Sequence, residues 1–346
     1  MPTGGQLNHK TVMAFFESLL YKAVSSGDVK ELQDFLDRGL SPDYSFTNTD
    51  NQSSLGKTLL EVAVMKTQHN IAQMLLSKKC NPNLTNIVDV ENYSLKLRPS
   101  LKRDRLKQTA IFPCIVRGEV EMVELLVKGG LDVNITDDRG CSALWHSVDL
   151  RNYSMTRAFA REKSCDVNMP DVTRLCPLHV AAIHGDVKLA SLLIRYGARI
   201  DVLTVRGSTP LIIACKKASY DTSRLLLLNG ADPNHKGING HTPISAVLEA
   251  CSDRQILDML IEAGACIDHA DIRKCLKEKL PLLKTSPDVL DTLRFLASNP
   301  RHLKVLCCLV IRKSLLDSKS DIHLVLKVQQ LPLPNIVKEF LLLNHL

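Results

Sequence analysis

The strongest constraint on the fold of this chain is a motif that returns at a fixed step. The segments CPLHVAAIHG, TPLIIACKKA and TPISAVLEAC begin at Cys176, Thr209 and Thr242, so each begins 33 residues after the one before it. Each is followed by an apolar run that closes on a glycine. Such self-similarity indicates repeated units that bury their apolar faces against their neighbours. The motif therefore predicts a stacked array of units.

Each copy of the motif predicts a pair of helices. Thr209 and Thr242 can cap the first helix, where a threonine oxygen accepts a backbone N–H. A proline follows at the first helical position, which needs no N–H; these prolines are Pro177, Pro210 and Pro243. A glycine in the left-handed conformation can end the second helix; these glycines are Gly197, Gly230 and Gly264.

Weaker copies extend the array toward the N-terminus. They begin at Leu19, Gly56, Thr109 and Ser142. We expect residues 1–18 to form a tail and the start of a capping helix, and residues 19–299 to form the array. The array is expected to carry a basic insertion at about 87–107 and to end in a degenerate unit at 272–299.

This pattern resembles the ankyrin repeat, a finger-like turn followed by two antiparallel helices. The resemblance implies an all-α solenoid of about seven to eight helix-turn-helix repeats. It also implies that His179, in CPLHVAA, is a structural hydrogen-bonding residue between neighbouring units rather than a ligand or base. Trp145 occupies the corresponding position one repeat earlier, and we expect it to lie in the core.

Residues 300–346 carry more apolar surface than so short a segment can bury alone. Residues 301–315 predict an amphipathic helix, with an apolar stripe of Leu303, Leu306, Cys307, Val310 and Ile311. Two prolines then enforce an extended bend, in the run Leu331, Pro332, Leu333 and Pro334. A short apolar helix closes the segment, which must dock on the array, on a partner, or on both.

These two halves, in this order, resemble the SOCS box, so that residues 300–346 are expected to form a small three-helix domain. Residues 301–315 resemble its elongin-binding BC box, which implies that the apolar stripe binds elongin B/C. Residues 331–346 resemble its cullin box, and the Leu-Pro-Leu-Pro form implies a type-five cullin with its RING protein. The alternatives are a helix that only caps the stack and a proline-stiffened loop.

The whole chain thus resembles the ankyrin repeat and SOCS box family. The resemblance implies a non-catalytic adaptor of an E3 ubiquitin ligase that holds an unknown protein substrate for ubiquitination and proteasomal degradation. A second hypothesis is an ankyrin scaffold without a ubiquitin role. An enzyme with appended repeats is a third, but no segment long enough for a catalytic domain remains, and the common nucleotide-binding and hydrolase motifs are missing from the sequence.

Finger tips and the outer sides of first helices supply the candidate substrate surface. Its residues are Arg139, His146, Leu150, Arg174, His184, Arg206, Lys217 and His235. Several are basic, which favours an acidic or mixed segment of the partner. Finger asparagines stand where an asparagine hydroxylase modifies some ankyrin proteins, although supporting the turn explains them equally well; they are Asn83, Asn134, Asn168 and Asn234.

Composition excludes other classes. The apolar runs are too short to span a membrane, and eleven scattered cysteines favour reduced thiols in the cytoplasm, with the nucleus as a second compartment. We expect neither cofactor nor metal, because no zinc-type spacing occurs. The basic insertion suits an import signal, a nucleic-acid contact, an acidic partner or a solvated flexible loop. We favour the loop and expect no nucleic acid, because no aromatic residue interleaves with the charges, which are Lys96, Arg98, Lys102, Arg103, Arg105 and Lys107.

Overall fold

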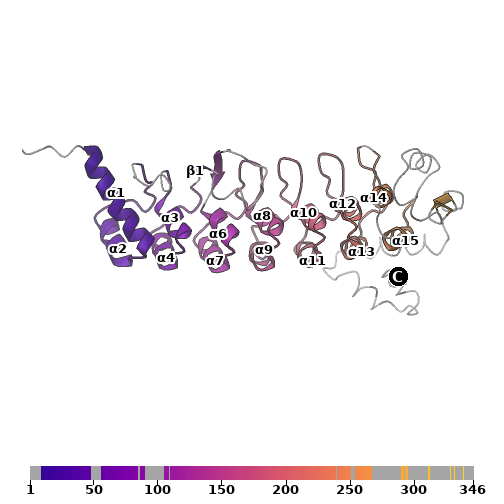
Figure 1. Cartoon of the computed structure of the whole chain (residues 1–346). Coiled ribbons are helices and arrows are strands. Elements are labelled where there is room, and N and C mark those ends of the chain that lie inside the picture. Colours follow the sequence, from indigo (N-terminus) through magenta and orange to yellow (C-terminus); the bar gives the residue numbers. More distant parts are fainter. Residues whose placement is uncertain are drawn as a thin grey trace, which may run out of the picture. The chain divides into compact units, whose positions relative to one another are not determined.

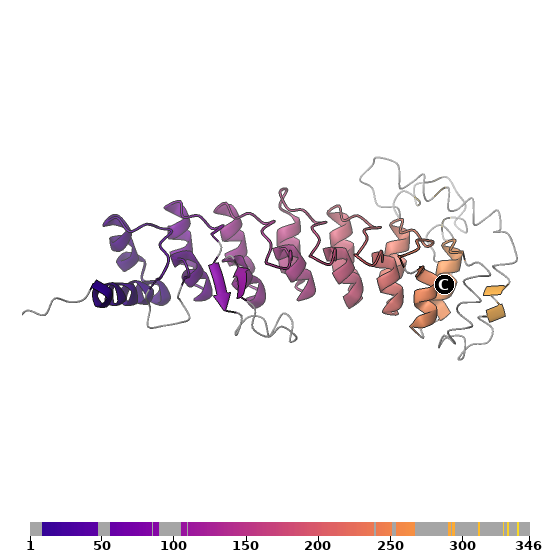
Figure 2. The same cartoon turned by 90° about the horizontal axis from the view of Figure 1, so that it is seen from above.

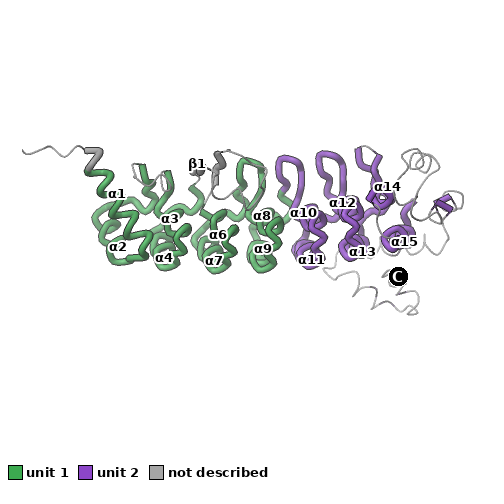
Figure 3. Tube along the Cα trace, viewed as in Figure 1, with its two compact units in different colours: residues 1–169 green, residues 170–346 purple. Residues whose placement is uncertain are grey.

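A computed structural model describes residues 9–47, 56–84, 86–89, 105–108, 110–238, 240–250 and 254–266, with a few single residues beyond them. The chain divides into two compact units, residues 1–169 and residues 170–346 (Figure 3). Each unit is taken by itself below. Within the described residues no helix combines the length and the apolar character that crossing a membrane requires.

The described residues of unit 1 form four pairs of helices. They are α1 (His9–Ser26) with α2 (Val29–Asp37), α3 (Leu59–Met65) with α4 (His69–Ser77), α6 (Ile111–Arg117) with α7 (Val120–Lys128), and α8 (Ala143–Asp149) with α9 (Tyr153–Ala160). First helices pack on first helices, in the order α1, α3, α6 and α8, and second helices follow the same order. Figure 1 shows these two rows within the unit.

Unit 2 repeats this arrangement with three described pairs. They are α10 (Pro177–His184) with α11 (Val187–Arg195), α12 (Pro210–Lys216) with α13 (Tyr220–Leu228), and α14 (Pro243–Glu249) with α15 (Arg254–Glu262). Helix α12 packs between α10 and α14, and α13 packs between α11 and α15. The stacked helix pairs confirm the ankyrin-type solenoid that the motif predicts.

The predicted helix signals are found where the motif places them. The hydroxyl of Thr209 accepts the N–H of Ile212 at 3.3 Å, and that of Thr242 accepts the N–H of Ser245 at 3.2 Å. A proline opens α10, α12 and α14, the described first helices of unit 2. The predicted glycines that follow the second helices have φ near 90°, in the left-handed region; they are Gly197, Gly230 and Gly264.

One feature differs from the helical expectation. Strands β1 (Asn86–Asp89) and β2 (Arg105–Gln108) form an antiparallel pair, with Asn86 opposite Gln108 and Asp89 opposite Arg105. Figure 2 shows the two strands side by side. Arg105 and Lys107, at the end of the basic insertion, therefore lie in a paired strand instead of a loop, whereas Lys96, Arg98, Lys102 and Arg103 lie outside the described residues. The isoleucine, valine and leucine residues in these segments favour a strand. The basic residues nearby led the sequence analysis to favour a loop instead.

Three finger asparagines join one repeat to the next within a unit. The amide nitrogen of Asn83 donates to the carbonyl of Gly130 at 3.1 Å, and its amide oxygen accepts the N–H of Asp132 at 2.7 Å. Asn134 bridges in the same way to Ser164 and Asp166, at 2.6 and 2.8 Å. A single side chain thus imitates a step of β-pairing between consecutive fingers.

Asn234 makes the third of these bridges. It donates to the carbonyl of Gly264 at 3.1 Å and accepts the N–H of Cys266 at 2.6 Å. Asp201 lies 33 residues before Asn234, at the equivalent finger position of the preceding repeat. Its carboxylate accepts the N–H of Asp232 at 3.2 Å. A carboxylate cannot donate the other half of the bridge. Burial raises the pKa of Asp201, although the N–H of Asp232 opposes the shift.

His179 and Trp145 lie in the core, as the sequence predicts. The Nδ1 atom of His179 accepts the N–H of Cys176 at 3.1 Å, which fixes the proton on Nε2. That Nε2 lies 3.1 Å from the carbonyl oxygen of Val202 and 3.2 Å from that of Ser208, both in the following finger. Burial lowers the pKa of His179 to about 4, although both carbonyls and Asp171 oppose the shift. His179 is therefore a neutral link between a helix and the next finger.

Candidate functional site

Five of the predicted substrate-contact residues lie in unit 2, on its fingers and at the ends of its first helices. Arg174 and Arg206 are exposed on finger tips, and Lys217 is exposed directly after α12. His184, at the end of α10, and His235, in a finger, are partly exposed. The Nε2 atom of His235 lies 3.1 Å from the carbonyl oxygen of Gly207, so this imidazole also connects two fingers. The unit places cationic side chains on the finger side.

The three predicted residues of unit 1 have different positions. Arg139 and Leu150 are partly exposed, the first in a finger and the second just after α8. His146 is buried, and its Nε2 lies 3.0 Å from Oδ2 of the buried Asp137. Selecting His146 as a surface residue was therefore wrong, because its imidazole is used inside the repeat.

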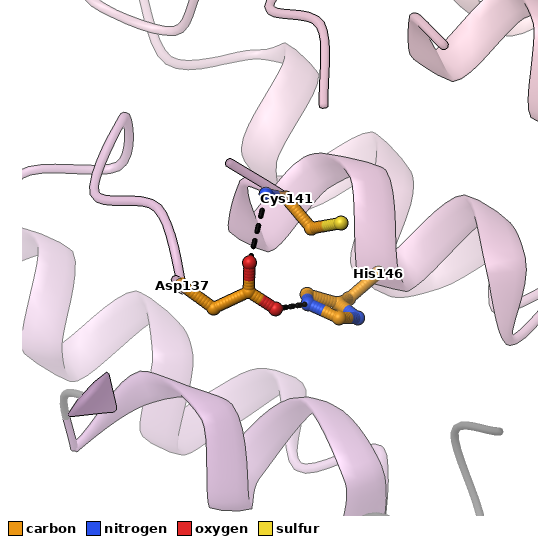
Figure 4. Close-up of side chains that lie close together, drawn as sticks. All are labelled: Asp137, Cys141 and His146. Atoms are coloured by element: carbon orange, nitrogen blue, oxygen red, sulfur yellow. Dashed lines mark hydrogen bonds and ion pairs between the residues drawn. The ribbon is translucent and has the colours of Figure 1, made fainter. Parts of the chain in front are cut away.

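Asp137, Cys141 and His146 bring three possible metal-ligating groups together, with ligand atoms within 4.8 Å of one another (Figure 4). All three residues are buried. The Oδ1 atom of Asp137 accepts the N–H groups of Arg139 and Cys141, both at 2.9 Å, while Oδ2 faces His146. The carboxylate is thus engaged by its own finger, and a structural zinc takes four ligands. The geometry supports a finger-locking turn.

The electrostatics of this turn agree with that interpretation. Burial alone would raise the pKa of Asp137, but its hydrogen bond to His146, the imidazole's charge and the two backbone N–H groups outweigh burial and hold the pKa below its usual value. The Nδ1 atom of His146 is buried and has no hydrogen-bond partner among the residues that the structure describes.

The C-terminal candidates fall mostly outside the described residues. These are Leu303, Leu306, Cys307 and Val310 of the elongin stripe and Pro332, Leu333 and Pro334 of the cullin run. Ile311 and Leu331 are described, and both are partly exposed. The N–H of Leu331 donates to the carbonyl of the buried Val328 at 3.2 Å. The elongin and cullin contacts remain predictions, as do the domain boundaries at 272–299 and 300–346.

Comparison with known proteins establishes the class first. The family model described as ankyrin repeats (3 copies) matches residues 163–237. The crystal structure of the ankyrin repeat domain of Bcl-3 aligns with a TM-score of 0.56 and 21% identity, over 70% of this chain and 97% of that domain. The B-cell lymphoma 3 protein homolog of Mus musculus is 29% identical over 250 residues, 70% of this chain and 51% of that protein. The chain therefore contains ankyrin repeats and has the ankyrin-repeat fold.

The C-terminal match narrows this class. The SOCS box model matches residues 299–342. Ankyrin repeat and SOCS box protein 5 of Oryctolagus cuniculus is 32% identical over 165 residues, 48% of this chain and 47% of that protein. Ankyrin repeat and SOCS box protein 16 of Homo sapiens is 29% identical over 182 residues, 50% of this chain and 36% of that protein. The chain thus combines ankyrin repeats with a SOCS box, as the ankyrin repeat and SOCS box family does. It spans about half or less of the length of these curated relatives.

Proposed function

We propose that this protein is the substrate-recognition adaptor of an elongin B/C–cullin–RING ubiquitin ligase. The observation that carries the proposal is the SOCS box match at residues 299–342, placed after an ankyrin array in one chain. The apolar stripe and the Leu-Pro-Leu-Pro run support the proposal independently, because a short segment with so much apolar surface needs other protein surfaces to bury it. The cytoplasm is the expected compartment.

The two parts of the chain have separate tasks in this proposal. The ankyrin fingers and first helices hold a protein substrate, and the box recruits the ligase. The protein itself breaks no bond. Its contribution is proximity, since tethering raises the effective concentration of substrate lysines near the ubiquitin thioester.

The elongin contact is expected to depend on Leu303, Cys307 and Ile311, which fall on one helical face. Burying a leucine side chain contributes roughly 1.5–3 kcal/mol, and one or two such anchors dominate many interfaces. The choice of a type-five cullin is the finer part of the proposal. It rests on the form of residues 331–334.

Affinity capture from cell extract tests the proposal. The tagged full chain should recover elongin B/C, and the double change Leu303→Ala with Cys307→Ala should remove most of it. Leu203→Ala with Cys266→Ala is the matched control, because it deletes the same two side-chain types from exposed sites in unit 2. This control should recover elongin normally.

A second pair of changes separates the cullin from elongin. Pro332→Ala with Pro334→Ala should keep elongin B/C and lose the type-five cullin. Equal recovery of elongin by the intact chain and by the Leu303 and Cys307 double variant would remove the ubiquitin role. The plain scaffold would then be the better explanation.

A further inference from the structure

The finger tips of unit 2 expose a regular row of aliphatic side chains. Val172, Val205 and Ile238 follow one another at steps of 33 residues, and 67%, 56% and 75% of their surfaces are exposed. A soluble surface does not usually leave large aliphatic side chains in register. Their equal spacing places one on each of three successive fingers. We call these three residues the tip row.

Backbone hydrogen bonds hold the tip row in register. The N–H of Val205 donates to the carbonyl of Thr173 at 3.2 Å, and the N–H of Ile238 donates to the carbonyl of Arg206 at 3.3 Å. Each bond therefore ties a residue of the row to the finger before it. The row is a pre-formed surface that pays little ordering entropy when it binds.

Gly207 allows the last of these approaches. Its φ is +69°, and a Cβ atom there would lie 2.9 Å from the backbone nitrogen of Ile238 and 3.1 Å from its Cγ1 atom. Any side chain at this position would push the third finger away from the second. The spacing of the tip row thus depends on a glycine that lies outside it.

The charges beside the row have a single sign. The tip segments 172–175, 203–207 and 236–238 contain Arg174, Arg206 and Lys236 and no acidic residue. All three cationic side chains are exposed. A partner that covers the aliphatic side chains therefore meets positive charge along its whole length, and acidic residues in that partner would be complementary.

The spacing indicates the conformation of the partner. Each finger leads into a first helix, and the first helices pack side by side. Packed helices lie about 8–10 Å apart, so neighbouring fingers are expected to have a similar spacing. A polyproline II segment has three residues per turn and rises about 3.1 Å per residue, so every third side chain returns to one face after about 9 Å. An α-helix would present a face at least 100° wide, whereas the tip row is essentially one side chain wide, with only Leu203 added in the middle finger.

We propose that the tip row of Val172, Val205 and Ile238 binds an extended acidic segment of the protein substrate, with an apolar residue at every third position. This inference rests on the proposed function for the existence of a protein substrate, and it adds the sequence class of that substrate. Each finger tip receives one apolar side chain. The neighbouring cations face the acidic residues between them.

The test uses the full chain and a fluorescent peptide of Leu-Glu-Pro repeated three times. Fluorescence polarisation should show saturable binding that weakens with salt. Val205→Ser and Ile238→Ser should each weaken it about tenfold, because one buried aliphatic side chain contributes on the order of that factor. Gly207→Ala should weaken it as well, although it leaves the tip row chemically unchanged.

Two controls match these changes. Phe15→Ser removes an apolar side chain that is 67% exposed in α1, and it should leave binding unchanged. A peptide of identical composition with its leucines made consecutive should bind at least tenfold more weakly. Circular dichroism of each variant checks that the fold is kept.

Several results would overturn the inference. These are no binding of the peptide, equal binding of the rearranged peptide, or equal binding by the Val205 and Ile238 variants. Tighter binding of a helical peptide with apolar residues seven apart would overturn the extended conformation. Binding of anionic vesicles through the same row, without competition from the peptide, would indicate a membrane surface instead. Elongin capture, measured on the same preparations, reports separately on the ligase role.

Discussion

Replacing His179 by leucine tests how much the hydrogen bonds between a first helix and the next finger contribute to stability. The change removes the acceptor of the Cys176 N–H and the donor to the Val202 and Ser208 carbonyls. The Ser208 carbonyl also accepts the N–H of Thr204 at 3.1 Å and keeps that bond. The N–H of the buried Cys176 and the carbonyl of the partly exposed Val202 therefore lose this partner. A net hydrogen bond contributes about 1 kcal/mol, and an unsatisfied buried group costs about 1–3 kcal/mol. We expect His179→Leu to lower the free energy of unfolding by roughly 2–4 kcal/mol at pH 7.

The pH dependence of this loss is the sharper part of the prediction. The pKa of His179 falls from 6.5 to about 4 in the folded state because of burial. Between these values the unfolded chain binds a proton that the folded chain does not, so the wild type loses stability as the pH falls. The linkage relation gives a loss of about 2 kcal/mol between pH 7 and pH 5, and of about 3 kcal/mol by pH 4. The leucine variant has no such proton to bind.

Urea denaturation followed by circular dichroism at pH 7, 6 and 5 measures both effects. The difference between wild type and variant should shrink by about 2 kcal/mol across this range. Taking the difference cancels the titration of carboxylates that the two proteins share. His184→Leu, at the partly exposed end of the same helix, controls for loss of a histidine outside the core. A constant difference from pH 7 to pH 5 would show that the burial argument is wrong.

Three further changes probe the repeat geometry. Thr67→Gly should stabilise the protein by up to about 1 kcal/mol in urea denaturation, because Thr67 has a left-handed φ of +59°. Gly118 occupies the equivalent position between the two helices of the next pair. Asp201→Asn should restore the second half of the finger bridge and add about 1 kcal/mol at pH 7. This gain should shrink toward low pH, where protonation of the raised-pKa carboxyl group restores a donor in the wild type. Asp137→Ala should cost about 3 kcal/mol, read from the fluorescence of Trp145, the single tryptophan, whose ring centroid lies 5.4 Å from that of His146. No change in that transition would contradict the role given to the Asp137 turn.

The sequence predicts the helix pairs well because the signals are local. A threonine or serine, a proline one residue later and a glycine after the second helix each act through their own backbone neighbourhood, as at Thr209, Pro210 and Gly230. Such signals hold whatever the rest of the chain does. The 33-residue step then orders the pairs.

The burial of His146 could not be predicted from local sequence signals. Residues 143–148 of α8 are all buried, so the helix has no polar face that would distinguish an inward from an outward side chain. The signal that could have identified the pair is Asp137, nine residues earlier, at the start of the finger turn. The paired strands were missed for another reason, because pairing depends on a partner segment across the insertion.

The finger asparagines have a chemical consequence for the lifetime of the protein. Asn83, Asn134 and Asn234 each use both ends of one amide to join two repeats. Spontaneous deamidation would turn that amide into a carboxylate, and the joint would then resemble the one that Asp201 makes. Deamidation would weaken the hydrogen bonds between two repeats and leave the helices on either side intact. A deamidated molecule would therefore separate first at the boundary between these repeats.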